Sequence, residues 1–190
     1  LSELNADIVA IGGHKGLFGL TGSGIVYCRE ALVNELKTPF VRQPVAAESA
    51  PAAACANSQF DYVRTAHRFE GGNPNFLGLR VLSKGAQLLD SIGLQHIEDR
   101  VRELTSTCLR MIKAAGFKTQ TPENWDERAQ IINVPMPDAT GMMDRLREKH
   151  RVIANVKDDA LRISMSFFNN EADLEKAVWA MKTEAARKAA

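Results

Sequence analysis

Short apolar runs open the chain and predict strands. Residues Ala6–Ile11 (ADIVAI) are apolar and β-branched and are followed by two glycines, so they predict a buried strand. Gly24–Cys28 (GIVYC) predicts a second strand, and Glu30–Lys37 predicts a short helix before a proline. The Ala-, Pro- and Ser-rich stretch Val41–Asn57 is typical of a long surface loop. Arg64–Asn75 (RTAHRFEGGNPN) ends in turn-forming residues and predicts a turn before a helix.

Helical periodicity fills the middle of the chain. Residues Phe76–Ile92 and Leu94–Ala115 predict two helices separated by Gly93. In the second helix, apolar residues recur at alternating spacings of four and three and form one stripe: Ile97, Val101, Leu104, Cys108, Met111 and Ala115. A stripe of this length indicates a helix packed on a core rather than a coiled coil. Gly116 is expected to end it.

Beyond Gly116, short strands alternate with helices. The pattern predicts strands over Ala129–Val134, Val152–Val156 and Leu161–Phe167, and helices over Gly141–His150 and from Glu171 onward. The order strand, helix, strand, strand, helix predicts a small α+β lobe over one sheet. In the last strand, alternation places Leu161, Ile163 and Met165 on one face and Arg162, Ser164 and Ser166 on the other.

Composition then narrows the classes of function. Lys and Arg number 24 against 23 Asp and Glu, a formal net charge of +1, which argues against binding nucleic acid or an acidic membrane surface. No apolar run reaches the roughly 18–20 residues of a membrane span. Three scattered cysteines without a CxxC pair favour a reducing, cytoplasmic setting. No histidine pair has metal-ligand spacing, so no metal site is expected, and His96 and His150 are expected to be solvated.

A glycine-rich stretch contains the first candidate for chemistry, His14-Lys15. Six of the chain's 13 glycines fall between Gly12 and Gly24, and glycine lets a backbone approach a ligand closely. A lysine leaving a strand into a partly closed site can form a Schiff base, whereas the alternative is a solvated surface lysine. A Walker loop would need Ser or Thr directly after Lys15, and a dinucleotide fingerprint would need glycine in place of Tyr27.

Arg162, in the middle of a predicted strand, is the second candidate. It lies either on a solvated face or in a cleft, where its planar guanidinium can bind a carboxylate through two hydrogen bonds.

These segments occur in an order that resembles a known family. A strand ending in His-Lys, a glycine loop, an R-F-E-G-G-N-P-N turn, two long helices and a late L-R-I-S strand resemble the C-terminal part of the class V aminotransferases. These are fold-type I pyridoxal-phosphate (PLP) enzymes that include cysteine desulfurases and isopenicillin N epimerase. The resemblance runs from about Asn5 to Met181. It implies an α/β fold in which residues 1–75 end the large PLP-binding domain and residues 76–190 form connecting helices and a small α+β domain.

The resemblance also implies roles for single residues. Lys15 is implied to be the Schiff-base lysine that binds PLP and moves the Cα proton, and His14 to lie beside the cofactor near its phosphate. Gly72 and Asn73 belong to a turn that reaches the cofactor phosphate of the partner subunit in a homodimer. Arg162 is implied to bind the α-carboxylate of an amino-acid substrate. The implied activities are those of an aminotransferase, an epimerase or a lyase.

The sequence departs from the family pattern at several positions. Gly12 replaces a common serine, Asn73 a threonine and Leu20 a proline. Residues 150–160 contain no cysteine, where cysteine desulfurases have their nucleophile, which disfavours that activity; only Cys55 could substitute. The family's pyridine-nitrogen aspartate and ring-stacking residue precede the lysine and have no counterpart here.

Three alternatives to an enzyme of this kind stay open. The chain starts abruptly at Leu1 and is expected to be a fragment. One alternative is therefore a non-catalytic fragment or subunit that supplies the small domain and a dimer interface to a longer partner. Another is a cysteine desulfurase without the usual loop cysteine. The third is a small-molecule-binding module that shares only the glycine loop and does not bind PLP.

Overall fold

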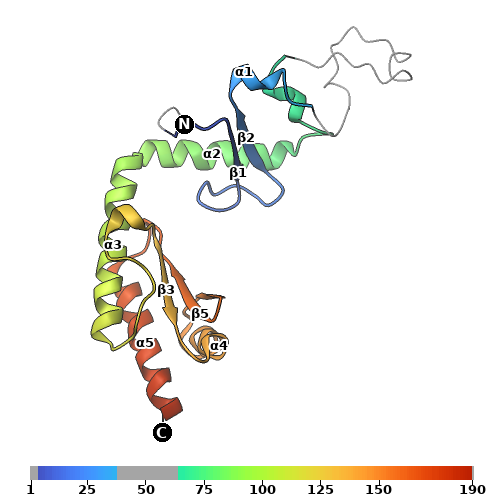
Figure 1. Cartoon of the computed structure of the whole chain (residues 1–190). Helices are drawn as coiled ribbons and strands as arrows, with labels where there is room; N and C mark the ends of the chain where they lie inside the picture. Colours follow the sequence, from blue (N-terminus) through green and yellow to red (C-terminus); the bar gives the residue numbers. More distant parts are fainter. Residues whose placement is uncertain (1–3, 38–63, 190) are drawn as a thin grey trace. The chain divides into compact units, whose positions relative to one another are not determined.

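The chain forms two compact units, Leu1–Ser91 and Ile92–Ala190. The computed structural model describes residues 4–37 and 64–189, and Figure 1 shows their helices and strands. The surface loop predicted over Val41–Asn57 lies outside the described residues, as does Cys55. The domain boundary predicted after Asn75 stays a prediction.

The N-terminal unit is built on a two-stranded antiparallel ribbon. Strands β1 (Ile8–Gly12) and β2 (Gly24–Cys28) pair from Ile8 opposite Cys28 to Gly12 opposite Gly24, which confirms both predicted strands. A Cβ on Gly24 would lie 2.8 Å from the Ile11 carbonyl oxygen, so the strands approach too closely there for a side chain.

The prediction that the first strand is buried is wrong. Ile8 is 50% exposed, and on the partner strand Val26 is 53% exposed. Within the part of the chain that the structure describes, β1 pairs only with β2, so the ribbon has no wider sheet to cover it. Apolar character therefore identified the strand but not its burial.

Helix α1 (Glu30–Val33) is shorter than the predicted Glu30–Lys37. The Val33 carbonyl oxygen accepts a 2.7 Å hydrogen bond from Nη1 of Arg68, a buried side chain of the short 3-10 helix η2 (Ala66–Phe69). In a longer helix that carbonyl would accept from the amide of Lys37. A side chain from a distant segment thus satisfies the carbonyl at the end of the helix.

Helix α2 (Phe76–Ile92) has the predicted bounds. Asn75 precedes it, and its side-chain oxygen accepts a 2.9 Å hydrogen bond from the Gly78 amide, which satisfies one of the free donors at the helix start. Gly93 follows with φ of +92°, a conformation that glycine adopts without strain, and separates α2 from the next helix.

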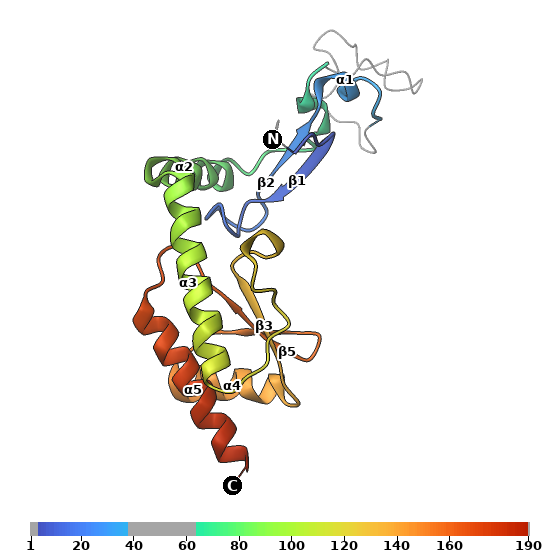
Figure 2. The same ribbon diagram turned by 60° about the vertical axis from the view of Figure 1, so that its left-hand side comes forward.

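The C-terminal unit packs three helices with a three-stranded sheet. In chain order it contains α3 (Leu94–Ala114), the 3-10 helix η3 (Trp125–Glu127), β3 (Ile131–Pro135), α4 (Ala139–His150), β4 (Asn155–Lys157), β5 (Ala160–Ser164) and α5 (Glu171–Ala189). The strands are antiparallel in the order β3-β5-β4. Helices α3 and α5 run beside each other along the sheet (Figure 2). This is the predicted α+β order.

One hydrophobic core joins these elements. Leu104 and Cys108 of the predicted stripe are fully buried, whereas Met111 and Ala115 pack at its margin. The core also includes side chains from the sheet and from α5: Ile132, Val134, Leu161, Leu174, Val178 and Met181. Gly116, with φ of +88°, follows the end of α3 as predicted.

Candidate functional site

Lys15 lies in the loop that joins β1 to β2. Three backbone hydrogen bonds close this loop: the Gly13 amide donates to the Ser23 carbonyl (3.0 Å), the Gly19 amide to the Gly13 carbonyl (2.8 Å), and the Phe18 amide to the Lys15 carbonyl (3.0 Å). Residues 14–18 therefore form a small closed turn that holds the backbone of Lys15 in place.

Glycines let this loop pack against itself and against α2. A Cβ on Gly13 or on Gly19 would lie 2.8 Å from a backbone carbonyl oxygen. It would also lie 3.2 Å (Gly13) or 3.1 Å (Gly19) from Leu82 Cδ1 of α2, which is a tight contact. A Cβ on Gly85 of α2 would overlap the Leu17 carbonyl oxygen. Phe18 has φ of +55°, which is rare for a bulky residue, so the packing imposes the shape of the loop.

The side chains of His14 and Lys15 are exposed and uncommitted. Neither makes a hydrogen bond or ion pair with any residue in the described ranges. The imidazole of His14 lies beside Gly12, where an added Cβ would be 3.8 Å from its Cε1 atom. A side-chain carbon at position 12 would therefore make only an ordinary contact with the His14 ring, and the Lys15 amine is available to a ligand.

The turn predicted to contact a phosphate lies in the same unit. Gly72 has φ of +85°, which allows the sharp change of direction before α2. At the end of the turn, the Asn75 side-chain nitrogen lies 3.9 Å from the position of a Cβ on Gly22, in the Lys15 loop. Packing within the N-terminal unit therefore brings the end of this turn beside the glycine loop.

Arg162 occupies the middle of β5 in the C-terminal unit. Its neighbour Leu161 is fully buried in the core, so Arg162 lies on the opposite face of the sheet. It stands directly across from Asn133 on β3 and Asn155 on β4. The half-buried guanidinium makes no hydrogen bond or ion pair with the residues that the structure describes, so its donors are free for an anion.

The connection before the Arg162 strand is very short. Lys157 pairs with Ala160, and only Asp158 and Asp159 lie between β4 and β5, with φ of +49° and +58°. Two residues with positive φ are typical of a type I′ hairpin turn. The usual place of a desulfurase cysteine is therefore a tight turn in this chain.

The two described cysteines are not placed as nucleophiles. Cys108 is fully buried in α3, and burial raises the pKa of its thiol to about 12. Cys28 ends β2, half-buried, with its sulfur 3.6 Å from the Arg29 carbonyl oxygen. Neither thiol lies near the β4–β5 turn in sequence.

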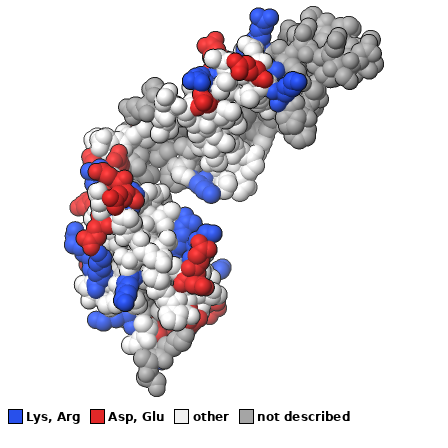
Figure 3. Space-filling model, viewed as in Figure 1, with Lys and Arg blue, Asp and Glu red and all other residues white. Residues whose placement is uncertain are grey.

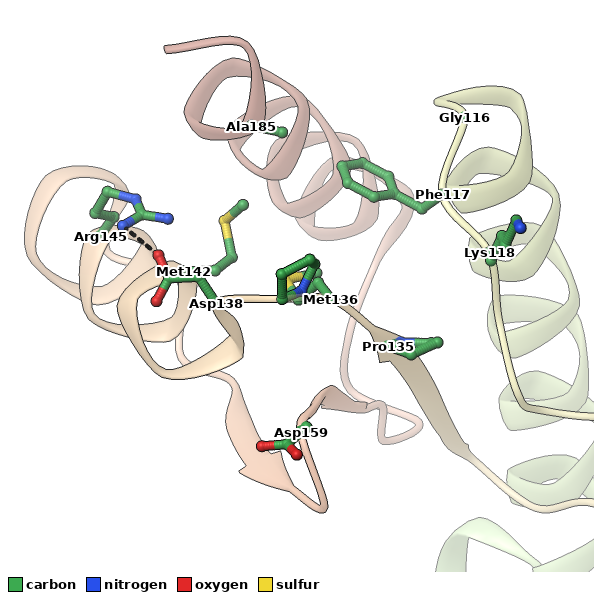
Figure 4. Close-up of a pocket in the computed structure, with 11 residues that line it drawn as sticks. Gly116, Phe117, Lys118, Pro135, Met136, Asp138, Met142, Arg145, Asp159 and Ala185 are labelled. Atoms are coloured by element: carbon green, nitrogen blue, oxygen red, sulfur yellow. Dashed lines mark hydrogen bonds and ion pairs between the residues drawn. The ribbon is translucent and has the colours of Figure 1, made fainter. Parts of the chain in front are cut away.

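The C-terminal unit contains a pocket of about 780 Å³ that the sequence pattern did not predict. Figure 4 shows its mainly apolar lining, to which Phe117, Met136 and Met142 contribute. At its margin Arg145 Nη1 and Asp138 Oδ2 form a 3.2 Å ion pair. None of the predicted site residues lines this pocket, whose charged lining also includes Lys118 and Asp159.

The expectation of a solvated His150 is wrong. Its side chain is only 11% exposed, its Nε2 lies 3.0 Å from Oε1 of the buried Glu184, and its ring meets Trp179 edge-on. Sequence neighbours on α4 are charged, but the packing of α5 against α4 covers this residue. His96, by contrast, is exposed.

In the described ranges, no three His, Cys, Asp or Glu side chains are grouped so that they could hold a metal ion. No helix among those residues is both long and apolar enough to span a bilayer.

Sequence comparison finds relatives over nearly the whole chain. The uncharacterized aminotransferase YcbU of Bacillus subtilis (strain 168) is 24% identical over 182 residues, which are 94% of this chain and 45% of that protein. A probable cysteine desulfurase of Pyrococcus abyssi is 26% identical over 137 residues, 72% of this chain and 33% of that protein. The chain spans less than half the length of these curated relatives.

Solved structures share the fold. The apo cysteine desulfurase of Thermococcus onnurineus NA1 matches with a TM-score of 0.85 at 22% identity, over 98% of this chain and 48% of that chain. A mutant of the lyase C-DES, with glycine covalently linked to its PLP cofactor, matches with a TM-score of 0.82 at 15% identity, over 95% of this chain and 47% of that chain. The family model for aminotransferase class-V matches residues 1–176. The chain therefore belongs to the class-V aminotransferase family.

Proposed function

We propose that this chain supplies the lysine-bearing half of the active site of a PLP-dependent enzyme that acts on an amino acid. Aminotransferase, epimerase and lyase activities are the candidates. The observation that carries the proposal is Lys15, an uncommitted amine held by a hydrogen-bonded glycine loop in a chain of this family. A homodimer with a site shared between subunits and a cytoplasmic location belong to the same proposal.

The residues present fit the cofactor of this family, PLP. Lys15 would hold the cofactor covalently through its primary amine. His14 and the Gly72-Asn73 turn provide hydrogen-bond donors for a phosphate, and the amide of Asn73 can donate where a threonine hydroxyl is usual. When bound, PLP withdraws electrons from the Cα of an amino acid.

The protein's own part in the reaction is binding, orientation and proton transfer. Lys15 Nζ accepts the proton from the substrate Cα and returns it to the carbon that the reaction requires. Arg162 binds the substrate carboxylate through two parallel N–H donors, which orients the Cα–H bond. Gly12 has no hydroxyl that could donate a hydrogen bond to the phosphate. His14 and the Gly72-Asn73 turn would therefore provide a larger share of the hydrogen bonds to the phosphate.

Cysteine desulfurase activity is the second candidate. The relatives named as probable cysteine desulfurases favour it, whereas the two-residue β4–β5 turn disfavours it. A non-catalytic subunit is a third candidate, because the chain spans less than half the length of its curated relatives. Product analysis with a panel of amino acids separates the candidates. A keto acid indicates an aminotransferase, an amino acid of inverted configuration an epimerase, sulfide from cysteine a desulfurase, and no product a non-catalytic subunit.

The first test traps the cofactor lysine. The chain is incubated with PLP, reduced with borohydride, and analysed by intact mass and peptide mapping. We expect one pyridoxyl group on the peptide that contains Lys15, and none after Lys15→Ala. Lys84→Ala is the matched control, because Lys84 is an exposed lysine of the same unit that bonds only to Gln87, and it should leave the adduct unchanged. An adduct that persists in Lys15→Ala would refute the assignment of Lys15, whereas no adduct in the wild type would favour a module that does not bind PLP.

A further inference from the structure

Three polar residues form a row across the sheet of the C-terminal unit. Asn133 on β3, Arg162 on β5 and Asn155 on β4 stand directly opposite one another in the strand register. Residues paired in this way place their Cβ atoms about 4.5–5.5 Å apart on the same face of the sheet. The opposite face bears the row Val134, Leu161 and Val156, of which Val134 and Leu161 are fully buried in the core.

The two asparagines that flank Arg162 differ in their hydrogen bonding. The side-chain oxygen of Asn155 accepts a 2.8 Å hydrogen bond from the Val156 amide. The side-chain oxygen of Asn133 is buried and accepts no hydrogen bond. A buried acceptor without a donor costs free energy, and such atoms are rare in folded proteins. The oxygen of Asn133 is therefore available to accept a hydrogen bond from a neighbouring side chain.

The backbone around Asn133 leaves that residue little freedom to turn away. Its amide donates to Thr121 Oγ1 (2.9 Å), and its carbonyl oxygen accepts from the Gln120 amide (3.1 Å). Both bonds hold the backbone of Asn133 against the segment of Gln120 and Thr121, on the edge of β3 that faces away from β5. The side chain directly opposite Asn133 on β5 is that of Arg162, whose guanidinium makes no hydrogen bond with the described residues.

We propose that Asn133 is a positioning residue for Arg162. When an amino-acid carboxylate binds, the side-chain oxygen of Asn133 accepts one N–H of the guanidinium while two other N–H groups hold the carboxylate. A guanidinium has five N–H donors, so both partners can be served at once. The inference rests on the proposed role of Arg162 as the carboxylate-binding residue and adds a second residue to that site.

The amide is the side chain that suits this role. An amide oxygen orients the guanidinium but leaves its positive charge available to the substrate. A carboxylate at position 133 would form an ion pair with Arg162 and compete with the substrate carboxylate. An apolar side chain would leave the guanidinium free to turn, so that more conformational entropy is lost on binding.

The test follows the Arg162 guanidinium directly by NMR. The chain is labelled with ¹⁵N-arginine, the Nε–H signal of Arg162 is assigned from its loss in Arg162→Lys, and sodium acetate is titrated against sodium chloride at equal ionic strength. In the wild type, acetate shifts this signal. In Asn133→Ala, the apparent affinity for acetate falls about tenfold, as expected for one lost hydrogen bond to a charged group. In Asn133→Asp, the signal is shifted before acetate is added, and the affinity falls further.

Asn155→Ala is the matched control. It removes the other flanking amide, whose oxygen already bonds to its own strand, so the affinity for acetate should stay within twofold of the wild type. In the cofactor-loaded enzyme, Asn133→Ala should raise KM for an amino acid and leave kcat nearly unchanged. Thermal unfolding of each variant identifies any variant that does not fold. If Asn133→Ala does not fold, Asn133→Asp, which keeps the size of the side chain, tests the positioning role.

The outcomes separate this inference from the proposed function. If acetate fails to shift the Arg162 signal in the wild type, the carboxylate site itself is refuted and the role of Asn133 with it. If Arg162 binds acetate but Asn133→Ala and Asn133→Asp bind it as the wild type does, only the positioning role is refuted. A loss in Asn155→Ala equal to that in Asn133→Ala would also refute it, because the effect would then belong to the strand rather than to the amide.

Discussion

Glu184 of α5 is a buried carboxylate surrounded by cations from two helices. Its side chain is 1% exposed, and His150 Nε2, Lys149 Nζ and Arg187 Nη1 lie within 3.2 Å of its oxygens, with Arg145 Nε at 3.6 Å. The hydrogen bond from His150, followed by that from Lys149, lowers the pKa of Glu184 to about 2, against the opposing effect of burial. Three of these four partners, Arg145, Lys149 and His150, come from α4, so Glu184 ties α4 to α5.

Replacing Glu184 by Gln should lower the stability of the chain at pH 7, because Arg145, Lys149 and Arg187 would keep no common counter-charge. The pH dependence follows from the lowered pKa. Since the folded value of about 2 lies below the ordinary value of 4.5, the carboxylate stabilises the fold fully above pH 4.5, and this contribution is lost as the pH falls toward 2. Chemical denaturation from pH 7 to pH 2 should show this loss in the wild type and a weaker one in Glu184→Gln.

Glu171→Gln serves as the control for this prediction. Glu171 is also on α5 and pairs with Arg100, but its side chain is 56% exposed, and exposed ion pairs contribute little. Its substitution should change the stability only slightly at any pH. Equal effects of the two substitutions would contradict the view that burial makes the Glu184 pairs important.

At the scale of elements, α2 and the Lys15 loop fit together through Gly85. This residue is buried on α2 against the Leu17 carbonyl, and that carbonyl belongs to the closed turn around Lys15. Alanine is ordinarily better than glycine in a helix by about 1 kcal/mol. Here the added methyl group must displace backbone atoms, which cannot rotate away as a side chain can.

Gly85→Ala should therefore destabilise the N-terminal unit, although it improves helix propensity. Overpacking costs about 1–3 kcal/mol, so a net loss of up to about 2 kcal/mol is expected in thermal unfolding followed by circular dichroism. The displaced loop should also reduce the yield of the borohydride adduct at Lys15. Gly71→Ala is the control, because nothing lies within 4 Å of its added Cβ. A Gly85→Ala chain that is as stable as the Gly71→Ala chain would contradict the packing argument.

At the scale of the whole molecule, the two units differ in how much apolar surface they bury. Of the buried hydrophobic residues in the described ranges, sixteen belong to the C-terminal unit and three, Val33, Leu82 and Leu89, to the N-terminal unit. Several large apolar side chains of the N-terminal unit are exposed, among them Phe76 (75%) and Leu77 (68%). Figure 3 shows acidic and basic groups close together on the visible face of the C-terminal unit.

Hydrogen exchange should reveal this difference in burial. Amides of α3, β5 and α5 should exchange slowly, and those of β1, β2 and α2 should exchange much faster, because a unit with few buried apolar contacts opens at low cost. Mass spectrometry of the deuterated chain, read peptide by peptide, measures the exchange rates in both units. Similar protection of the two units would show that the N-terminal unit is stabilised by more than its own described contacts.

The sequence by itself determined the elements whose signals are local. Gly93 and Gly116, both with positive φ, bound α3, and Asn75 begins α2, so these limits could be predicted from residue types. The order of motifs around Lys15 and Arg162 was also enough to indicate the family that the comparison found. Local backbone preference and motif order act over short stretches of chain, and a sequence displays both directly.

Only the tertiary structure decided the features that depend on distant partners. Arg68 binds the Val33 carbonyl at the end of α1, α5 covers His150, and the strand register places Asn133 opposite Arg162. The exposure of β1 is of the same kind, because burial depends on what packs against a strand and not on its own residues. These contacts join residues far apart in the chain, and no local pattern encodes which pairs will meet.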